Sequence, residues 1–122
     1  MYTLGLGSIS NSDFSITGSV ARAPSGSSAR NWFIKLQQVI NRYYKVAGFS
    51  PFSVDGELGS TTTSALKKSA SYAISRMGSS YYLTIAMDAS SSKDYAYAAD
   101  SIGGLLEGIA NSLGLTSTIP SV

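Results

Sequence analysis

The chain has 122 residues, which is enough for one domain with a single modest hydrophobic core. It contains no histidine and no cysteine. This composition excludes disulfides, thiol nucleophiles, Ser-His-Asp triads and zinc sites ligated by histidine or cysteine. We therefore assign the chain no catalytic residue, no metal site and no cofactor.

The formal net charge of +2 is too small to indicate nucleic-acid binding, so we expect no nucleic-acid partner. The charge is uneven, because residues 29–78 are basic and residues 79–122 are acidic. Either the two halves attract each other within one fold, or the basic half faces an anionic partner. Residues 1–12 lack the pattern of a signal peptide, and no window of the sequence is apolar enough to span a bilayer.

Residues 1–22 are predicted to be β-like, because apolar residues alternate there with small or polar ones. The apolar members of the pattern are Tyr2, Leu4, Leu6, Phe14, Ile16 and Val20. The apolar side is thin, so we expect this arm to pack on another surface, either the core of its own chain or a neighbouring subunit. Residues 23–28 have the composition of a linker, so residues 1–28 form the predicted arm and linker.

A first helix is predicted over residues 29–46, with Gly48 as its stop signal. Its apolar face comprises Trp32, Leu36, Val39, Ile40 and Tyr43, and its polar side comprises Lys35, Gln38 and Arg42. A loop follows over residues 49–59, and its apolar side chains are expected to pack beneath the helices.

Residues 54–66 read Val-Asp-Gly-Glu-Leu-Gly-Ser-Thr-Thr-Thr-Ser-Ala-Leu, a turn followed by a helix start. Asp55-Gly56 is a turn dipeptide, because aspartate can bond its own downstream backbone and glycine tolerates a positive φ. The hydroxyl residues at positions 60–62 are all competent N-caps, and Gly78 is a stop signal. This pattern predicts a second helix over about residues 60–77.

Residues 81–87 (YYLTIAM) are apolar and β-prone, and we favour a strand there over a buried helix. A last helix is predicted over residues 91–113, with Asp100 and Glu107 opposite its apolar face and Gly103 off the apolar stripe. Residues 116–122 are expected to form an extended tail. The predicted fold class is mainly α: a small three-helix bundle over residues 29–115, with a β-like N-terminal arm.

Two elements of the sequence each match part of a known sequence pattern. Val54, Asp55, Gly56, Leu58, Gly59, Thr62, Ala65 and Leu66 match Val-Asp-Gly-x-(aromatic or aliphatic)-Gly-x-x-Thr-x-x-Ala-(Val or Leu). Upstream, Leu36, Gln37, Ile40 and Asn41 match Leu-Gln-x-x-(Leu or Ile)-Asn. Together, over residues 30–77, they resemble the peptidoglycan-binding domain found on bacterial and phage wall hydrolases. The chain departs from that family at Ser60, where proline is common, and at Ser69-Ala70, where Phe-Gln is common.

The resemblance implies a peptidoglycan-binding-like helical bundle whose ligand lies in a shallow groove beside the glycine turn. The implied ligand-binding residues are Asp55, Gly56, Leu58, Gly59 and Thr62, although several of these positions can specify the turn itself. Tyr44 joins them as a candidate for stacking on a sugar, since it falls at the edge of the first helix's apolar face.

Catalysis by a carboxylate pair is the weaker interpretation of the same loop. A glycosidase needs two carboxylates about 5–10 Å apart. Asp55 and Glu57 are close in sequence, but they lie on a basic, loop-exposed element with no evident apolar pocket. We expect a turn-forming aspartate and a solvated glutamate instead.

The resemblance and the composition together favour a non-catalytic peptidoglycan-binding-like module, a structural or wall-contacting subunit of a phage particle. Its expected partners are a wall glycan and, through both terminal arms, other subunits of an assembly. Its expected location is the virion or the cell wall. Two alternatives stay open: a purely structural assembly protein that keeps the fold without binding glycan, and a small lytic enzyme or its accessory domain.

Overall fold

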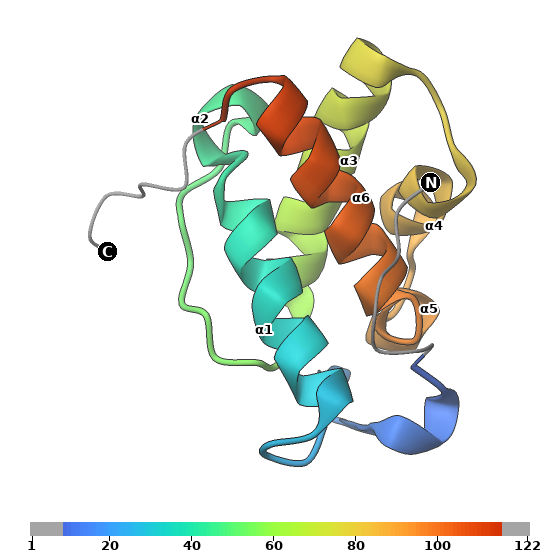
Figure 1. Ribbon diagram of the computed structural model, residues 1–122. Coiled ribbons are helices and arrows are strands. Elements are labelled where there is room, and N and C mark those ends of the chain that lie inside the picture. Colours follow the sequence, from blue (N-terminus) through green and yellow to red (C-terminus); the bar gives the residue numbers. More distant parts are fainter. Residues whose placement is uncertain (1–8, 116–122) are drawn as a thin grey trace.

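The computed structural model describes residues 9–115 (Figure 1). In chain order its elements are a 3-10 turn (Asn11–Asp13), β1 (Ser15–Thr17), β2 (Val20–Arg22), α1 (Ser28–Asn41), α2 (Tyr44–Ala47), α3 (Ser60–Met77), α4 (Tyr81–Asp88), α5 (Ser92–Ala96) and α6 (Ala99–Ser112). The predicted mainly α bundle with a β-like N-terminal arm is confirmed. The predictions for Tyr2, Leu4 and Leu6 and for the tail over 116–122 lie outside the described residues.

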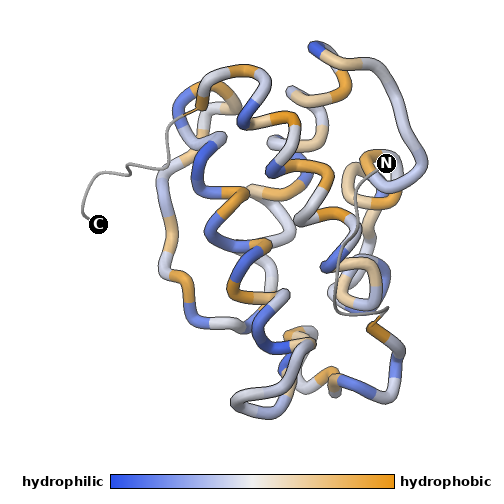
Figure 2. Tube along the Cα trace, in the orientation of Figure 1, coloured by the Kyte–Doolittle hydropathy of each residue, from blue (hydrophilic) through white to orange (hydrophobic). Residues whose placement is uncertain are grey.

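The three long helices α1, α3 and α6 form the body of the bundle. Helix α1 packs along α6, α3 crosses behind them, and α4 packs on α3 (Figure 1). Hydrophobic and hydrophilic positions alternate along α1 and α6, as expected for helices with one buried face (Figure 2). The largest fully buried apolar and aromatic side chains are Tyr43, Tyr95, Phe33, Leu36, Ile40, Leu58, Leu66, Leu83, Ile102 and Leu106.

The first helix ends five residues earlier than predicted. Helix α1 begins after Ser27, whose Oγ accepts a hydrogen bond from the N–H of Arg30 at 3.1 Å, and it stops at Asn41. The backbone then tightens to i→i−3 bonds, from Arg42 to Val39 and from Tyr43 to Ile40. This bend places Tyr43 in the core, where its hydroxyl donates to the carbonyl of Leu106 at 2.6 Å. The short helix α2 follows and ends at Gly48 with φ 81°.

The predicted second helix is confirmed as α3, but its N-cap was predicted wrongly. Gly59 occupies the N-cap position, and no side chain caps the helix there. The hydroxyl of Thr63 instead donates to the carbonyl of Gly59 at 2.9 Å. The expected stop at Gly78 is confirmed, with φ 90°.

The prediction of a strand over residues 81–87 is wrong, because these residues belong to helix α4 (Tyr81–Asp88). Leu83 and Ala86, three positions apart, are buried against the core, whereas Tyr81, Tyr82 and Met87 remain exposed. The described sheet has only two strands, and the segment pairs with neither. Intrahelical hydrogen bonds therefore satisfy its backbone.

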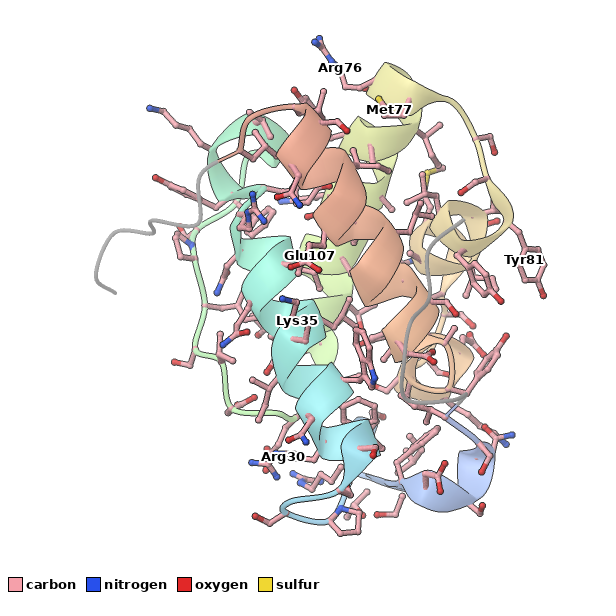
Figure 3. All side chains as sticks on the ribbon, in the orientation of Figure 1. Arg30, Lys35, Arg76, Met77, Tyr81 and Glu107 are labelled. Atoms are coloured by element: carbon pink, nitrogen blue, oxygen red, sulfur yellow. The ribbon has the colours of Figure 1, made fainter. Side chains whose placement is uncertain are left out.

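The last predicted helix is broken into α5 and α6 at residues 97–98, which changes the phase of its faces. Asp100, expected on the outer side, is only 4% exposed. Gly103, expected off the apolar stripe, packs against α1, and an added Cβ would lie 3.7 Å from the backbone of Leu36 and 3.7 Å from the ring of Trp32. Glu107 faces outward as expected and pairs with Lys35 at 2.6 Å (Figure 3).

The described part of the N-terminal arm packs on the core of its own chain. β1 and β2 form an antiparallel hairpin joined by Gly18 and Ser19, both with positive φ (59° and 66°), as in a type I′ turn. Phe14 packs edge-on against Phe33, with ring centroids 5.8 Å apart. Over residues 9–115, no helix combines the length and the hydropathy needed to cross a membrane.

Candidate functional site

The side chain of Gln37 holds the acidic glycine loop against α1. Its exposed fraction is 1%, and its Oε1 accepts from the N–H of Gly56 at 2.7 Å. Its Nε2 lies 3.0 Å from Oδ1 of Asp55, 2.9 Å from the carbonyl of Glu57 and 3.1 Å from Oγ1 of Thr62. Two amide hydrogens thus serve three acceptors, so one hydrogen is shared. A single side chain joins α1, the turn and the first turn of α3.

Asn41 makes a second attachment one helical turn further along α1. Its Nδ2 donates to the carbonyl of Phe52 at 2.8 Å, and its Oδ1 accepts from the N–H of Phe52 at 3.1 Å. Gln37 and Asn41 are four residues apart, so both amides emerge from the same face of the helix. The Leu-Gln-x-x-Ile-Asn element therefore positions the loop that follows it.

Gly56 occupies a position that only glycine fits well. Its φ is +74°, and an added Cβ would lie 2.1 Å from Nε of Arg30. Arg30 crosses the turn at this point and donates from Nη2 to the carbonyl of Asp55 at 2.9 Å. Leu58 then joins the hairpin through two backbone hydrogen bonds with Ala21, of 2.9 and 3.0 Å.

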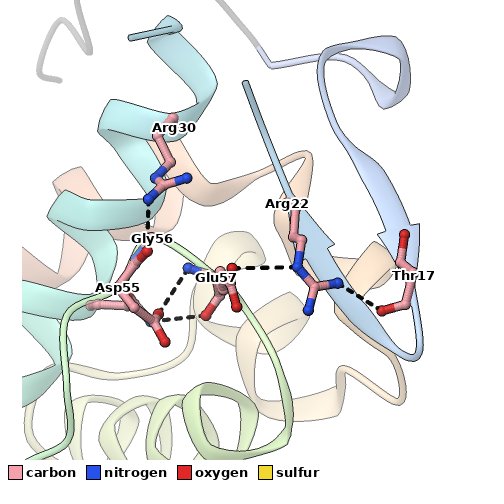
Figure 4. Close-up of polar contacts among 7 residues, drawn as sticks. Thr17, Arg22, Arg30, Asp55, Gly56 and Glu57 are labelled. Atoms are coloured by element: carbon pink, nitrogen blue, oxygen red, sulfur yellow. Dashed lines mark hydrogen bonds and ion pairs between the residues drawn. The ribbon is translucent and has the colours of Figure 1, made fainter. Parts of the chain in front are cut away.

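The outer side of the loop carries a row of polar contacts that ends on the hairpin (Figure 4). Oδ1 of Asp55 accepts from the N–H of Glu57 at 2.9 Å, which closes the turn. The Glu57 carboxylate pairs with Nε of Arg22 at 3.4 Å, and Nη1 of Arg22 donates to the carbonyl of Thr17 at 3.0 Å. Both partners of the ion pair are about 40% exposed, so it contributes at most about 1 kcal/mol to stability.

A hollow of about 400 Å³, here called the turn groove, lies between the loop, the hairpin and the start of α3. Its lining residues are Val20, Gln37, Phe52, Ser53, Asp55, Glu57, Gly59, Ser60, Thr61 and Thr62. A neighbouring hollow shares Phe52, Ser60 and Thr61 and adds the half-buried ring of Phe49. The loop therefore presents two aromatic rings beside a polar helix start.

Several polar groups of the turn groove have no partner within residues 9–115. Oδ2 of Asp55 and the hydroxyls of Ser60 and Thr61 are among them. The backbone N–H groups of residues 60–62 also lack an acceptor, because α3 has no side-chain cap and its first backbone bond comes from Thr63. The turn groove thus offers hydrogen-bond donors and acceptors side by side.

The structure brings together some of the predicted ligand-binding residues and separates others. Asp55, Gly59 and Thr62 line the turn groove, but Thr62 is buried and bonded to Gln37. Gly56 gives its N–H to Gln37, and Leu58 is fully buried in the core. Tyr44 begins α2 and is not part of the lining.

Other members of the lining were missed at the sequence level. Gln37 was recognised as a motif residue but not as a buried one, although its place beside Leu36 and before Ile40 on α1 was a usable signal. Val20 enters the lining from the hairpin, and nothing local in the sequence indicates that contact. Ser53 is an exposed polar residue without any pattern that distinguishes it, and Thr61 was identified only as a candidate N-cap.

The two carboxylates of the loop already have partners. Asp55 accepts two N–H groups through one oxygen, and Glu57 is held by an arginine at the surface. Within residues 9–115, no group of three or more histidine, cysteine, aspartate or glutamate side chains is arranged to hold a metal ion. The arrangement is suited to recognising polar ligands by hydrogen bonds.

Comparisons of the chain with known proteins found no matching protein family, no similar curated protein and no similar solved structure.

Proposed function

We propose that this protein is a non-catalytic module that binds the glycopeptide of the bacterial cell wall in the turn groove. The observation that carries the proposal is that the open polar groups of the groove lie on the loop and the helix start that together resemble the peptidoglycan-binding domain. Asp55 supplies a free carboxylate oxygen, and Ser60 and Thr61 supply hydroxyls beside unpaired backbone N–H groups.

The chemistry of such a ligand matches this lining. A wall glycan carries hydroxyls and acetamido groups, which both donate and accept hydrogen bonds, and its sugar rings have apolar faces. The donors at the start of α3 suit acetamido and carboxylate oxygens, and Asp55 suits hydroxyls or an amine. Phe52, half-buried at the rim and 6.4 Å from the ring of Phe49, suits the face of a sugar. Tyr44, on α2, is outside this set.

We further propose that the module serves as a wall-contacting or structural subunit of a phage particle, located on the virion or at the cell wall. Its terminal arms would contact other subunits, and the wall glycan would occupy the turn groove. Support for this assignment comes from the resemblance to modules carried by phage wall hydrolases and from the Ser- and Gly-rich composition of the arm.

A purely structural assembly protein is the second candidate, and one observation favours it. Gln37 engages the polar groups of Gly56 and Thr62, so part of the motif is used inside the fold. In that case the motif preserves a scaffold, and the protein binds no glycan.

Co-sedimentation with purified peptidoglycan sacculi tests the proposal. Thr61→Glu places a bulky carboxylate at the mouth of the groove, and an acidic residue in the first turn of a helix does not destabilise it. Ser71→Glu makes the same change on an exposed position further along α3, outside the groove. We expect wild type and Ser71→Glu to sediment with sacculi and Thr61→Glu to stay in solution, with all three folded by circular dichroism.

Failure of the folded wild type to sediment would contradict wall binding and leave the structural candidate. The lytic alternative has its own test, in which the pure protein is added to a suspension of walls. Clearing that is abolished by Glu57→Gln would establish an enzyme and overturn the proposed non-catalytic role.

A further inference from the structure

A second hollow, of about 470 Å³, lies on the other side of the start of α3 and is here called the lysine hollow. Its walls come from the hairpin, α3 and the start of α5, and its lining includes Ile16, Ser19, Ser60, Ser64, Lys67 and Lys93. Ser60 lines both hollows, so the turn groove and the lysine hollow meet at the first residue of α3.

Lys67 and Lys93 are the charged residues in the lining of the lysine hollow, which contains no acidic side chain. Neither ammonium group has an ion pair or a hydrogen bond within residues 9–115. Asp94 follows Lys93 directly, but its Oδ2 accepts from the N–H and hydroxyl of Ser90 and from the N–H of Ser91. That carboxylate is thus committed to its own helix start.

The walls of the lysine hollow are fixed in place before any ligand arrives. The buried hydroxyl of Ser92 donates to the carbonyl of Ser19 at 2.6 Å, which ties the start of α5 to the hairpin turn. The hydroxyls of Thr63 and Tyr95 lie 2.6 Å apart and join α3 to α5. The two lysines therefore project from rigid elements, which lowers the entropic cost of binding.

The two hollows carry free charges of opposite sign. Asp55 presents an unpaired carboxylate oxygen in the turn groove, and the two lysines present unpaired ammonium groups in the lysine hollow. Ser60 and Lys67 are seven residues apart on α3, which corresponds to about 10 Å along the helix axis. Three or four residues of extended peptide span about the same distance.

We propose that the lysine hollow binds the carboxylates of the wall stem peptide while the turn groove holds the sugar end of the same ligand. This inference rests on the proposed wall-binding function and assigns a second subsite to it. The stem peptide bears several free carboxylates on a short chain of small residues. Lys67 and Lys93 pair with the carboxylates, and the exposed side chain of Ile16 contacts the small apolar side chains.

Nuclear magnetic resonance titration of the full chain tests this assignment with a soluble disaccharide-tetrapeptide released from sacculi. The matched probe is the same muropeptide with its carboxylates converted to amides. The test variant is the double substitution Lys67→Gln/Lys93→Gln. Its control, Lys45→Gln/Lys68→Gln, removes the same charge from exposed positions on α2 and α3 outside the hollow. Poly(glycerol phosphate) is included as an anionic wall polymer without a peptide.

We expect the unmodified muropeptide to shift backbone signals of both the turn groove and Ser64, Lys67 and Lys93. The test variant should bind it up to about fivefold more weakly for each lysine removed, and the control variant as tightly as wild type. The amidated probe should bind wild type as weakly as the unmodified probe binds the test variant.

Shifts confined to the turn groove, with equal affinity in both double variants, would overturn the second subsite and leave the proposed function standing. No shift anywhere would overturn both. Lysine-dependent binding of poly(glycerol phosphate) without such binding of the muropeptide would assign the hollow to a phosphate polymer and also overturn the inference.

Discussion

Replacing Gln37 by leucine is the sharpest test of how the loop is held. Leucine has nearly the volume of glutamine and suits a buried helix position, so the change removes hydrogen bonds without leaving a large cavity. The N–H of Gly56 and Oγ1 of Thr62 are buried and lose their partner in this variant. The carbonyl of Glu57 and the carboxylate of Asp55 lie nearer the surface, where water replaces the lost bonds.

The expected loss in the free energy of unfolding follows from the two buried polar groups that lose their partner. An unsatisfied buried polar group costs about 1–3 kcal/mol, so the pair costs about 2–6 kcal/mol. Burying the leucine side chain offsets about 1–2 kcal/mol of this cost. The net loss in the free energy of unfolding therefore centres on about 2–3 kcal/mol, within a range of about 0–5 kcal/mol. This is a large part of the ~5–15 kcal/mol typical of a domain.

Urea unfolding followed by circular dichroism at 222 nm measures this loss. The control is Gln38→Leu, because Gln38 is exposed and makes no hydrogen bond within the described residues. We expect the control to lie within about 0.5 kcal/mol of wild type. A Gln37→Leu protein as stable as the control would refute the argument that this amide holds the turn in place.

Three further substitutions test other parts of the fold by the same unfolding assay. Hydrogen bonds from the side chain and backbone of Ser90 lower the pKa of Asp94. The ionised Asp94 therefore stabilises the fold above pH 3.8, and this stabilisation is lost as the pH falls through the pKa of Asp94 in the folded protein. Asp94→Asn should therefore lose less stability than wild type on acidification, and an identical acid dependence would contradict this cap. Burial raises the pKa of Tyr95. The neutral phenol therefore contributes fully to the free energy of unfolding below pH 10.0, and this contribution is lost as the pH rises through the pKa of Tyr95 in the folded protein. Tyr95→Phe should be about 1 kcal/mol less stable than wild type at neutral pH, because it loses the hydrogen bond with Thr63. Its free energy of unfolding should not fall at alkaline pH as that of wild type does. An equal alkaline fall in both proteins would show that another group causes it. Gly103→Ala should raise the free energy of unfolding by up to about 1 kcal/mol, since the added methyl meets its neighbours at ordinary contact distance, and destabilisation would show that α1 and α6 pack more tightly than described.

The sequence predicted those elements best whose signals are local. Helix α3 was placed correctly because periodic apolar residues lie between two glycines, Gly59 and Gly78, that have special backbone roles. The β-like character of the arm followed from alternation, but the hairpin between Ser15–Thr17 and Val20–Arg22 and its turn at Gly18-Ser19 were not identified. Both elements depend on contacts within a few residues along the chain.

The errors arose where tertiary contacts overrule local preference. Residues 81–87 are β-prone, but α3 offers a surface that buries only Leu83 and Ala86 and leaves no strand to pair with. Neither helix break contains glycine or proline at the break itself. The helices break near residues 42 and 97, and a fully buried tyrosine, Tyr43 or Tyr95, lies within two residues of each break. Asp100 then falls on the inner side, which a continuous helix could not predict.

The residues of the candidate site also divide into those that local sequence identified and those that depend on tertiary contacts. Asp55, Gly59 and Thr62 were identified from the motif, and they do line one hollow. That Gln37 engages the turn from α1 required the orientation of two helices and a loop, which no spacing along the chain supplies. The lysine hollow depends on the hairpin meeting α3 and α5, so sequence alone gave no sign of it.

The central claim is that wall glycopeptide occupies the turn groove, and amide hydrogen exchange in the presence of sacculi tests it most directly. The N–H groups of Ser60, Thr61 and Thr62 have no acceptor in the described part of the chain and should exchange fast in the free protein. The N–H of Gly56, bonded to Gln37, serves as an internal reference that exchanges slowly in both states. The account predicts that sacculi slow exchange at residues 60–62 and leave Gly56 unchanged. Protein that binds sacculi while residues 60–62 exchange as fast as before would contradict it.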